Sequence, residues 1–364
     1  MPSSANMRNI PIGNDGEEIP IYWNDGTSKD GARSAYIMIH GKLRDGDEYW
    51  TIMNDALSSA VKDDYPGVDE NALVIAPQFF STEYNKGQYG EHQLAFGDVN
   101  AWQAGDIATH PEGTSKSSID ALDAIVAEFA NKDEYPNIAN ITIVGHGGGG
   151  QLITRYAAVG SLPEDVYVRF IVGDASTHAY FSEHRPVDKD DTDGKGCEYW
   201  NTWRYGFDNF TGTAAGKKDL WDYFEQYVNR DIVFLVANND TKENGDQYCP
   251  ALMQGGVARR DRNLAWWAYI NTLARTREPV ELFGVASFKN LPDWSWATSR
   301  SGTIVPRLVV IDGADHDADK VFGSDEGRAA LFSSGDIPAG WRPDGYTDTE
   351  TDCSYCSSTN ETKD

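Results

Sequence analysis

The chain is poor in positive charge and has no long apolar run, and each shortage excludes a class of partner. Its 364 residues carry 31 Lys and Arg against 57 Asp and Glu, a formal net charge of −26. The electric field of so negative a protein repels phosphate backbones and anionic lipid, so we expect no nucleic-acid partner. No stretch approaches the roughly 18 consecutive apolar residues of a membrane-spanning helix, so we expect no membrane span.

Signatures of bound cofactors are also missing. The sequence has no dinucleotide fingerprint, no phosphate-binding loop and no His-Glu-x-x-His pattern. We therefore expect neither an organic cofactor nor a catalytic metal. The first 18 residues lack the apolar core of a signal peptide. The acidic composition is compatible with secretion and does not exclude a cytoplasmic location, and the oligomeric state is left open.

Cysteine is scarce, with four residues in the chain. Cys353 and Cys356 lie in a polar tail rather than at a strand-to-helix turn, which argues against a thioredoxin-type redox role. A zinc site there would need two more ligands, and the tail has no histidine. Cys197 and Cys249 lie in loop-like segments. They can form one long-range disulfide, and a structural disulfide or free thiols is the expected state of the four cysteines, whose pairing is left open.

Apolar strands alternate with amphipathic helices through most of the chain. This alternation predicts an α/β fold with a mostly parallel sheet that is covered by helices on both faces. The strands are expected at residues 19–23, 35–39, 72–77, 141–144, 166–172, 232–236 and 303–311, and the helices at 47–61, 115–130, 264–273 and 326–331.

Changes in composition divide the chain into five parts. Residues 174–227 are rich in Asp, Gly, Trp and Tyr, lack a clean period, and form too long a stretch for an ordinary connection. We expect an insertion there that caps the carboxyl edge of the sheet, where open α/β sheets bind ligands. The predicted division is an N-terminal arm with strands (1–34), a first core half (35–173), a cap or lid (174–230), a second core half (231–335) and a polar, irregular tail (336–364).

The stretch from Gly145 to Gly150 has the frame of a nucleophile elbow. An apolar β-branched run, 141–144, precedes it, and a helical pattern follows it. A strand, a glycine-framed turn and a helix form the context in which a Gly-x-Ser-x-Gly motif presents its serine. Here Gly145 and Gly149 occupy the two glycine positions. Gly147 occupies the middle position and has no side chain that can attack a substrate.

Two polar loops follow strands later in the chain. Asp240 comes directly after the expected strand 232–236, and His316 comes after the last expected strand. Since parallel strands end at one edge of a sheet, both loops are expected to meet the elbow there. A base that takes a hydroxyl proton and a carboxylate that fixes its tautomer are the partners of an attacking hydroxyl. Asp174 and Asp312 compete with Asp240 as the carboxylate, which we prefer because of its place in chain order.

His316 stands between two acidic residues, Asp315 and Asp317. Negative neighbours favour the imidazolium form, so we expect them to raise the pKa of His316. A solvated loop histidine is the plain alternative. The position directly after a strand favours the role of a base.

The chain carries a nucleophile position, an acid and a histidine, in that order. In this order it resembles the α/β-hydrolase-fold serine hydrolases of the esterase or lipase-like kind. The resemblance covers most of the chain and rests on Ile39-His40-Gly41, on the elbow and on the two polar loops. It implies an α/β-hydrolase fold with an oxyanion hole formed by the backbone N–H groups of Gly148 and of a residue near Lys42. It also implies an elbow serine, and the chain departs from the family at this point, Gly147.

Five residues near these motifs are expected to face a substrate. Aromatic side chains in irregular segments can line an apolar acyl or aryl pocket, although plain packing is their more frequent role. A histidine inside the elbow is expected to pack beside the base rather than act as one. The five residues are His40, Gly41, Trp102, His146 and Trp200.

The resemblance implies a carboxylic ester hydrolase that acts on a small molecule, a bulky apolar ester or lactone. Glycine at position 147 disables covalent catalysis, so a serine-to-glycine variant of such an enzyme is one interpretation. A natural pseudoenzyme that binds a small molecule in the former active site is a second. A third is an enzyme in which a dyad of His316 and Asp240 acts as a base without a serine.

Overall fold

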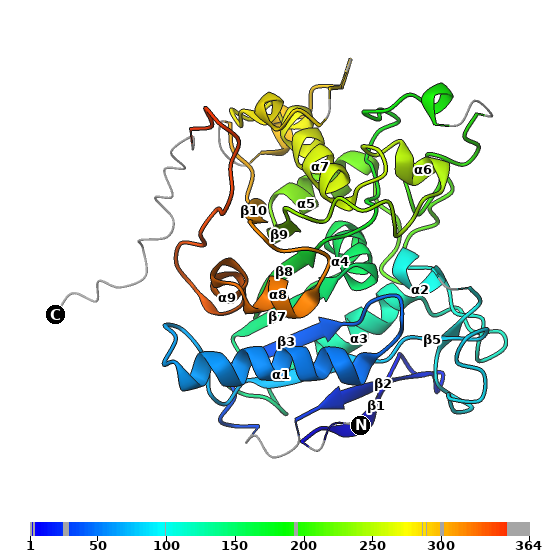
Figure 1. Cartoon of the computed structure of the whole chain (residues 1–364). Coiled ribbons are helices and arrows are strands. Elements are labelled where there is room, and N and C mark those ends of the chain that lie inside the picture. Colours follow the sequence, from blue (N-terminus) through cyan, green and yellow to red (C-terminus); the bar gives the residue numbers. More distant parts are fainter. Residues whose placement is uncertain are drawn as a thin grey trace.

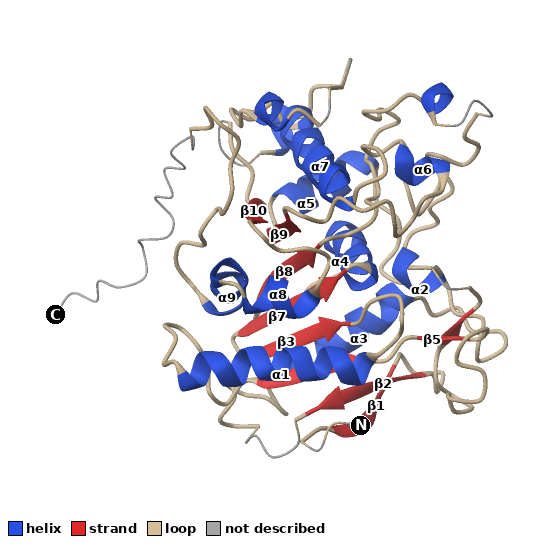
Figure 2. Cartoon of the chain, viewed as in Figure 1, coloured by secondary structure: helices blue, strands red, loops and turns tan. Residues whose placement is uncertain are grey.

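The computed structural model describes residues 2, 4–24, 29–98, 100–192, 196–285, 287–288, 290–298 and 302–347. An eight-stranded sheet runs through this part of the chain in the order β1-β2-β4-β3-β7-β8-β9-β10 (Figures 1 and 2). β1 and β2 pair antiparallel, β2 also runs antiparallel to β4, and the remaining pairs are parallel. The predicted mostly parallel sheet is confirmed. The strands are β1 Asn6–Pro11, β2 Glu18–Trp23, β3 Ser34–Ile39, β4 Leu73–Pro77, β7 Asn140–His146, β8 Tyr167–Gly173, β9 Asp231–Ala237 and β10 Arg307–Ile311.

Both faces of the central strands are buried, which is why these segments read as continuous apolar runs. In β9 every residue is buried. Ile232, Phe234 and Val236 join the hydrophobic cluster on one face of the sheet, whereas Val233 and Leu235 join the cluster on the other face. This alternation follows from the period of two in a strand.

Helices cover the two faces (Figure 1). α1, α8 and α9 contribute to the cluster on one face, and α3, α4, α5 and α7 contribute to the cluster on the other. None of the described helices combines the length and apolarity that crossing a membrane requires. The helices are α1 Gly46–Lys62, α2 Ala101–Ala104, α3 Ser118–Ala130, α4 Gly148–Val159, α5 Leu220–Val228, α6 Cys249–Leu252, α7 Arg259–Leu273, α8 Ala318–Gly323 and α9 Asp325–Phe332; β5 Phe80–Ser81 and β6 Ala95–Phe96 form a separate small sheet.

The segment between β8 and α5, residues 174–219, is irregular, whereas the end of the stretch 174–227 forms α5. Its described part contains one short 3₁₀ turn, Lys189–Asp191, and no strand or α-helix. Tyr180, Phe181 and Phe207 of this segment nevertheless belong to the same hydrophobic cluster as α4 and α7. This segment is therefore packed into the core on this face of the sheet.

A disulfide ties this segment to the start of α6. Cys197 and Cys249 are bonded, with 52 residues of separation in sequence. The pairing is the one that the sequence offers as a long-range disulfide. Cys353 and Cys356 lie outside the described residues.

The start of the expected tail lies against the sheet. The N–H of Val310 in β10 donates to the carbonyl of Ala339, and the N–H of Trp341 donates back to the carbonyl of Val310. Arg342 donates to the carbonyl of Leu308 in the same strand. Residues 339–342 therefore take up the outward N–H and carbonyl of Val310 and the carbonyl of Leu308, groups that an uncovered edge strand would expose.

Loss of the disulfide is expected to destabilise the chain. The 52-residue separation of its cysteines corresponds to roughly 4 kcal/mol of loop-closure entropy in the unfolded state. The double variant Cys197→Ser/Cys249→Ser should therefore unfold at a lower denaturant concentration than the oxidised parent. Reductant should lower the midpoint of the parent and leave that of the double variant unchanged. Equal midpoints for all samples would contradict this expectation.

Candidate active site

Gly147 occupies a sharp turn between β7 and α4. Its backbone has φ +57° and ψ −109°, and its N–H donates to the carbonyl of Gly173 at 2.9 Å. A positive φ of this kind strains any residue that carries a Cβ. The flanking glycines are required by close contact, because a Cβ on Gly145 would lie 2.5 Å from the carbonyl carbon of Gly149. The local sequence therefore folds into the predicted strand, turn and helix.

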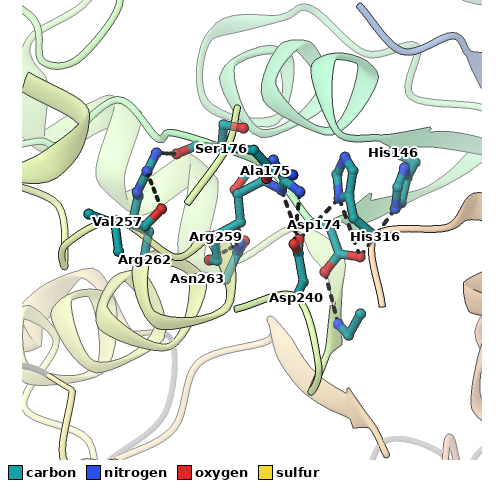
Figure 3. Close-up of polar contacts among 12 residues, drawn as sticks. His146, Asp174, Ala175, Ser176, Asp240, Val257, Arg259, Arg262, Asn263 and His316 are labelled. Atoms are coloured by element: carbon teal, nitrogen blue, oxygen red, sulfur yellow. Dashed lines mark hydrogen bonds and ion pairs between the residues drawn. The ribbon is translucent and has the colours of Figure 1, made fainter. Parts of the chain in front are cut away.

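His316 and Asp240 are in contact (Figure 3), and His316 lies beside this turn. A Cβ built on Gly147 would lie 3.1 Å from Nε2 of His316. On the other side of the ring, Nδ1 of His316 lies 3.0 Å from Oδ2 of Asp240. Asp240 also accepts two hydrogen bonds of 2.8 Å from Nε and a terminal nitrogen of Arg259. The arrangement keeps Nε2 of His316 directed toward the elbow.

The charges of this pair follow from burial and from the surrounding donors. Burial would raise the pKa of Asp240, but hydrogen bonds from His316 and Arg259 outweigh it and hold the pKa below its ordinary value. Burial lowers the pKa of His316, and the bond to Asp240 only partly opposes it. The predicted rise of the His316 pKa is wrong. Asp315, one of the two acids that prediction relied on, forms an ion pair of 2.8 Å with Lys320.

A second histidine–aspartate pair lies next to the first. Nε2 of His146 is 3.1 Å from Oδ2 of Asp174, and both residues are buried. The rings of His146 and His316 are 4.3 Å apart between centroids. Asp174 also accepts a hydrogen bond from the N–H of Ala237, and it approaches Nδ1 of His316 only to 3.9 Å. Of the competing acids, Asp240 therefore makes the shorter contact with His316.

Two other features of the acids bear on the site. Asp312, the third competitor, accepts a hydrogen bond from the side chain of Asn238. The side-chain atoms of His146, Asp174 and His316 that could bind a metal ion lie within 4.8 Å of one another. Hydrogen bonds among these residues and Asp240 already account for this proximity.

Two backbone nitrogens, those of Gly148 and Lys42, lie in the region of the elbow. Gly148 is the first residue of α4, so its N–H has no acceptor one turn earlier in the helix. The backbone nitrogen of Lys42 lies 3.1 Å from the position of a Cβ on Gly148. The backbone at Lys42 therefore lies close to the first residue of α4.

Three of the residues that were expected to face a substrate lie beneath the site instead. His40 is fully buried, its Nδ1 lies 2.8 Å from the carbonyl of Gly41, and its Nε2 accepts the N–H of Phe79. Neither ring nitrogen is left for a ligand. Trp102 is also fully buried and stacks on Phe79. The buried ring of His146 is engaged by Asp174, and these residues therefore support the loops of the site.

The other two positions differ from these. Gly41 is buried in the turn before Lys42, where a Cβ would lie 2.7 Å from the hydroxyl oxygen of Tyr49. Trp200 is half-buried and lies under the guanidinium group of Arg185, 5.0 Å from it. Neither contact involves the elbow.

Two polar side chains of the site are absent from the sequence-based predictions. Arg259 binds Asp240, and Gln103 packs against Gly148. Arg259 begins α7 in the run Arg-Arg-Asp-Arg. Cations are unfavourable at the N-terminus of a helix unless acceptors from other parts of the chain bind them. This run therefore indicated that its arginines have such acceptors. Nothing in the local sequence distinguishes Gln103.

Comparisons with known proteins agree on the fold. No family model matches the chain, and no curated protein matches it in sequence. The LpqC poly(3-hydroxybutyrate) depolymerase from Bordetella parapertussis is similar in structure, with a TM-score of 0.58, 19% identity, and coverage of 92% of this chain and 91% of that chain. Poly(aspartic acid) hydrolase-1 from Sphingomonas sp. KT-1 has a TM-score of 0.56 and 16% identity, over 89% of this chain and 97% of that one. The chain has the predicted α/β-hydrolase fold.

Acid is expected to destabilise the chain through its buried histidines. Burial lowers the pKa of His40 to about 4 and that of His178 to about 3. Because the unfolded chain then binds more protons, stability falls as the pH drops below about 6.5. The titration of each of these two histidines should lower the free energy of unfolding by about 2 kcal/mol between pH 7 and about pH 5, as measured by urea denaturation.

The slope of the free energy of unfolding against pH distinguishes the titration of a buried histidine from its contribution to packing. His40→Met should flatten the pH dependence, whatever it does to stability at neutral pH. His92→Met, at an exposed histidine, should leave the slope unchanged. A slope that is the same in the parent and in His40→Met would refute the assignment.

Proposed function

We propose that this site is the active site of a carboxylic ester hydrolase and that Gly147 deprives it of its nucleophile. In this proposal His316 is the base, Asp240 orients its ring, and the N–H groups of Gly148 and Lys42 bind the carbonyl oxygen of an ester. The substrate class is a bulky apolar ester or lactone. The chain then binds such a molecule and lacks covalent turnover.

The observation that carries the proposal is the position of the missing side chain. A Cβ on Gly147 would lie 3.1 Å from Nε2 of His316. A hydroxyl on that carbon would need this nitrogen as the acceptor of its proton. The base retains its hydrogen bond to Asp240. The names of the two structural neighbours, a depolymerase and a hydrolase, are in keeping with hydrolytic chemistry.

Restoring a hydroxyl at the elbow is the direct test. Gly147→Ser should raise kcat/KM for p-nitrophenyl butyrate by at least about 10³-fold, because loss of a triad serine costs far more than that. A burst of p-nitrophenol should report an acyl-enzyme. The substitution should also cost about 1–3 kcal/mol of stability, since a Cβ at this positive φ is strained.

Two controls isolate the hydroxyl. Gly147→Ala adds the same strained Cβ without an oxygen, and it should gain no activity. The double variant Gly147→Ser/His316→Ala should lose the burst, because the base is absent. If Gly147→Ser folds and shows no more esterase activity than Gly147→Ala, the proposed function is wrong.

A second candidate follows from the space above Gly147. With no Cβ present, a water molecule can stand where the hydroxyl would be and give its proton to Nε2 of His316. Slow hydrolysis by the unaltered chain that His316→Ala abolishes would favour this dyad. Since the pKa of His316 is lowered, the base should stay neutral, and the activity persist, to a lower pH than for an ordinary histidine. Ligand binding without turnover by either the unaltered chain or Gly147→Ser would favour a binding protein.

A further inference from the structure

We propose that the side-chain amide of Gln103 is a third hydrogen-bond donor of the oxyanion hole. This inference rests on the proposed function and assigns to the same site a residue outside the elbow and the two polar loops. The ligand group that it would take is the carbonyl oxygen of an ester or lactone, or the oxyanion formed from it.

The amide of Gln103 lies against the first turn of α4. It comes from α2, the short helix beside α4 in Figure 1. A Cβ on Gly148 would lie 3.0 Å from Nε2 of Gln103 and 3.1 Å from the backbone nitrogen of Lys42. The amide and the two backbone donors therefore border one small space. Because Gly148 has no side chain, the amide can approach the elbow this closely.

A buried chain of hydrogen bonds fixes which end of the amide faces the elbow. Arg155 donates to the hydroxyl oxygen of Thr177 at 3.0 Å, and an arginine can only donate. Thr177 gives its own proton to Oε1 of Gln151, and Nε2 of Gln151 donates to Oε1 of Gln103. The oxygen of Gln103 is thereby committed to Gln151. Its NH₂ group is the end that faces Gly148.

That NH₂ group is buried and has no partner. Gln103 is 4% exposed, and its Nε2 makes no hydrogen bond to the described part of the protein. A buried donor without an acceptor is costly, so an unpaired one at a site calls for an explanation. The oxygen of a bound carbonyl would supply the acceptor. Its demand for hydrogen bonds grows as negative charge develops on it in the transition state.

The test uses Gln103→Glu in the Gly147→Ser background. Glutamate keeps an oxygen that accepts from Gln151 and replaces the donor by a second acceptor. We expect kcat for p-nitrophenyl butyrate to fall by about 10²-fold with little change in KM, which is the signature of a lost oxyanion donor. Gln103→Met, which is neutral and also lacks the donor, should lose a similar factor.

A matched control makes the same amide-to-acid change elsewhere. Gln226 lies in α5 and donates to the carbonyl of Ala158 near the far end of α4. Gln226→Glu in the same background should keep the kcat of its parent. If both variants at position 103 fold and keep kcat within about threefold of the parent, a factor well below that of a lost oxyanion donor, Gln103 is not a donor to the reacting oxygen.

A binding experiment on the unaltered chain separates this inference from the proposed function. Without a nucleophile the ester stays intact, so p-nitrophenyl butyrate can be added while the side-chain ¹H–¹⁵N signals are recorded by NMR. The signal pair that Gln103→Glu removes belongs to Gln103, and we expect the ester to shift it. No shift at saturating ester would overturn the inference. A shift together with an inactive Gly147→Ser variant would keep the donor and reject the esterase assignment.

Discussion

The close approach of the first turn of α4 to the sheet is the constraint on which the site depends. A Cβ on Gly149 would lie 2.3 Å from the carbonyl oxygen of Ile39, and one on Gly150 would lie 2.5 Å from that of Gly173. Only glycine permits these contacts, and they hold the turn at Gly147 above the edge of the sheet. Since β7, β8 and β9 are parallel, the residues that follow β8 and β9, Asp174 among them, arrive at the same edge.

Several polar residues beside Gly147 are buried, and their burial has an electrostatic cost. Asp240 is buried, and an isolated buried carboxylate would take up a proton. Hydrogen bonds from Arg259 and His316 keep it ionised. A protein that had no use for a neutral, oriented His316 would gain little from maintaining this pair. The same reasoning applies to the buried relay from Arg155 to Gln103, whose last donor is directed at the elbow.

Patterns that act over a few residues were readable from the sequence, whereas contacts between distant segments were not. The strand at 141–144 and the glycine-rich turn after it predicted the elbow, because local conformation dictates both. The order of Asp240 and His316 predicted their shared edge through the geometry of parallel strands. Burial of His40 depends on packing against Phe79 and Trp102, which come from other parts of the chain. Sequence patterns cannot distinguish a histidine that is buried by such distant contacts from a histidine on the surface.

The segment along β10 bears on how copies of this protein can associate. Ala339 and Trp341 occupy the hydrogen-bonding groups of Val310, so this side of the sheet offers little main chain for another strand to join. At the opposite side, the outermost described strand is β1, whose residues are largely exposed. Growth of a continuous sheet from copy to copy needs two complementary open sides. The covered strand therefore leaves little main chain on this side for such growth, and the net charge of −26 adds mutual repulsion between copies.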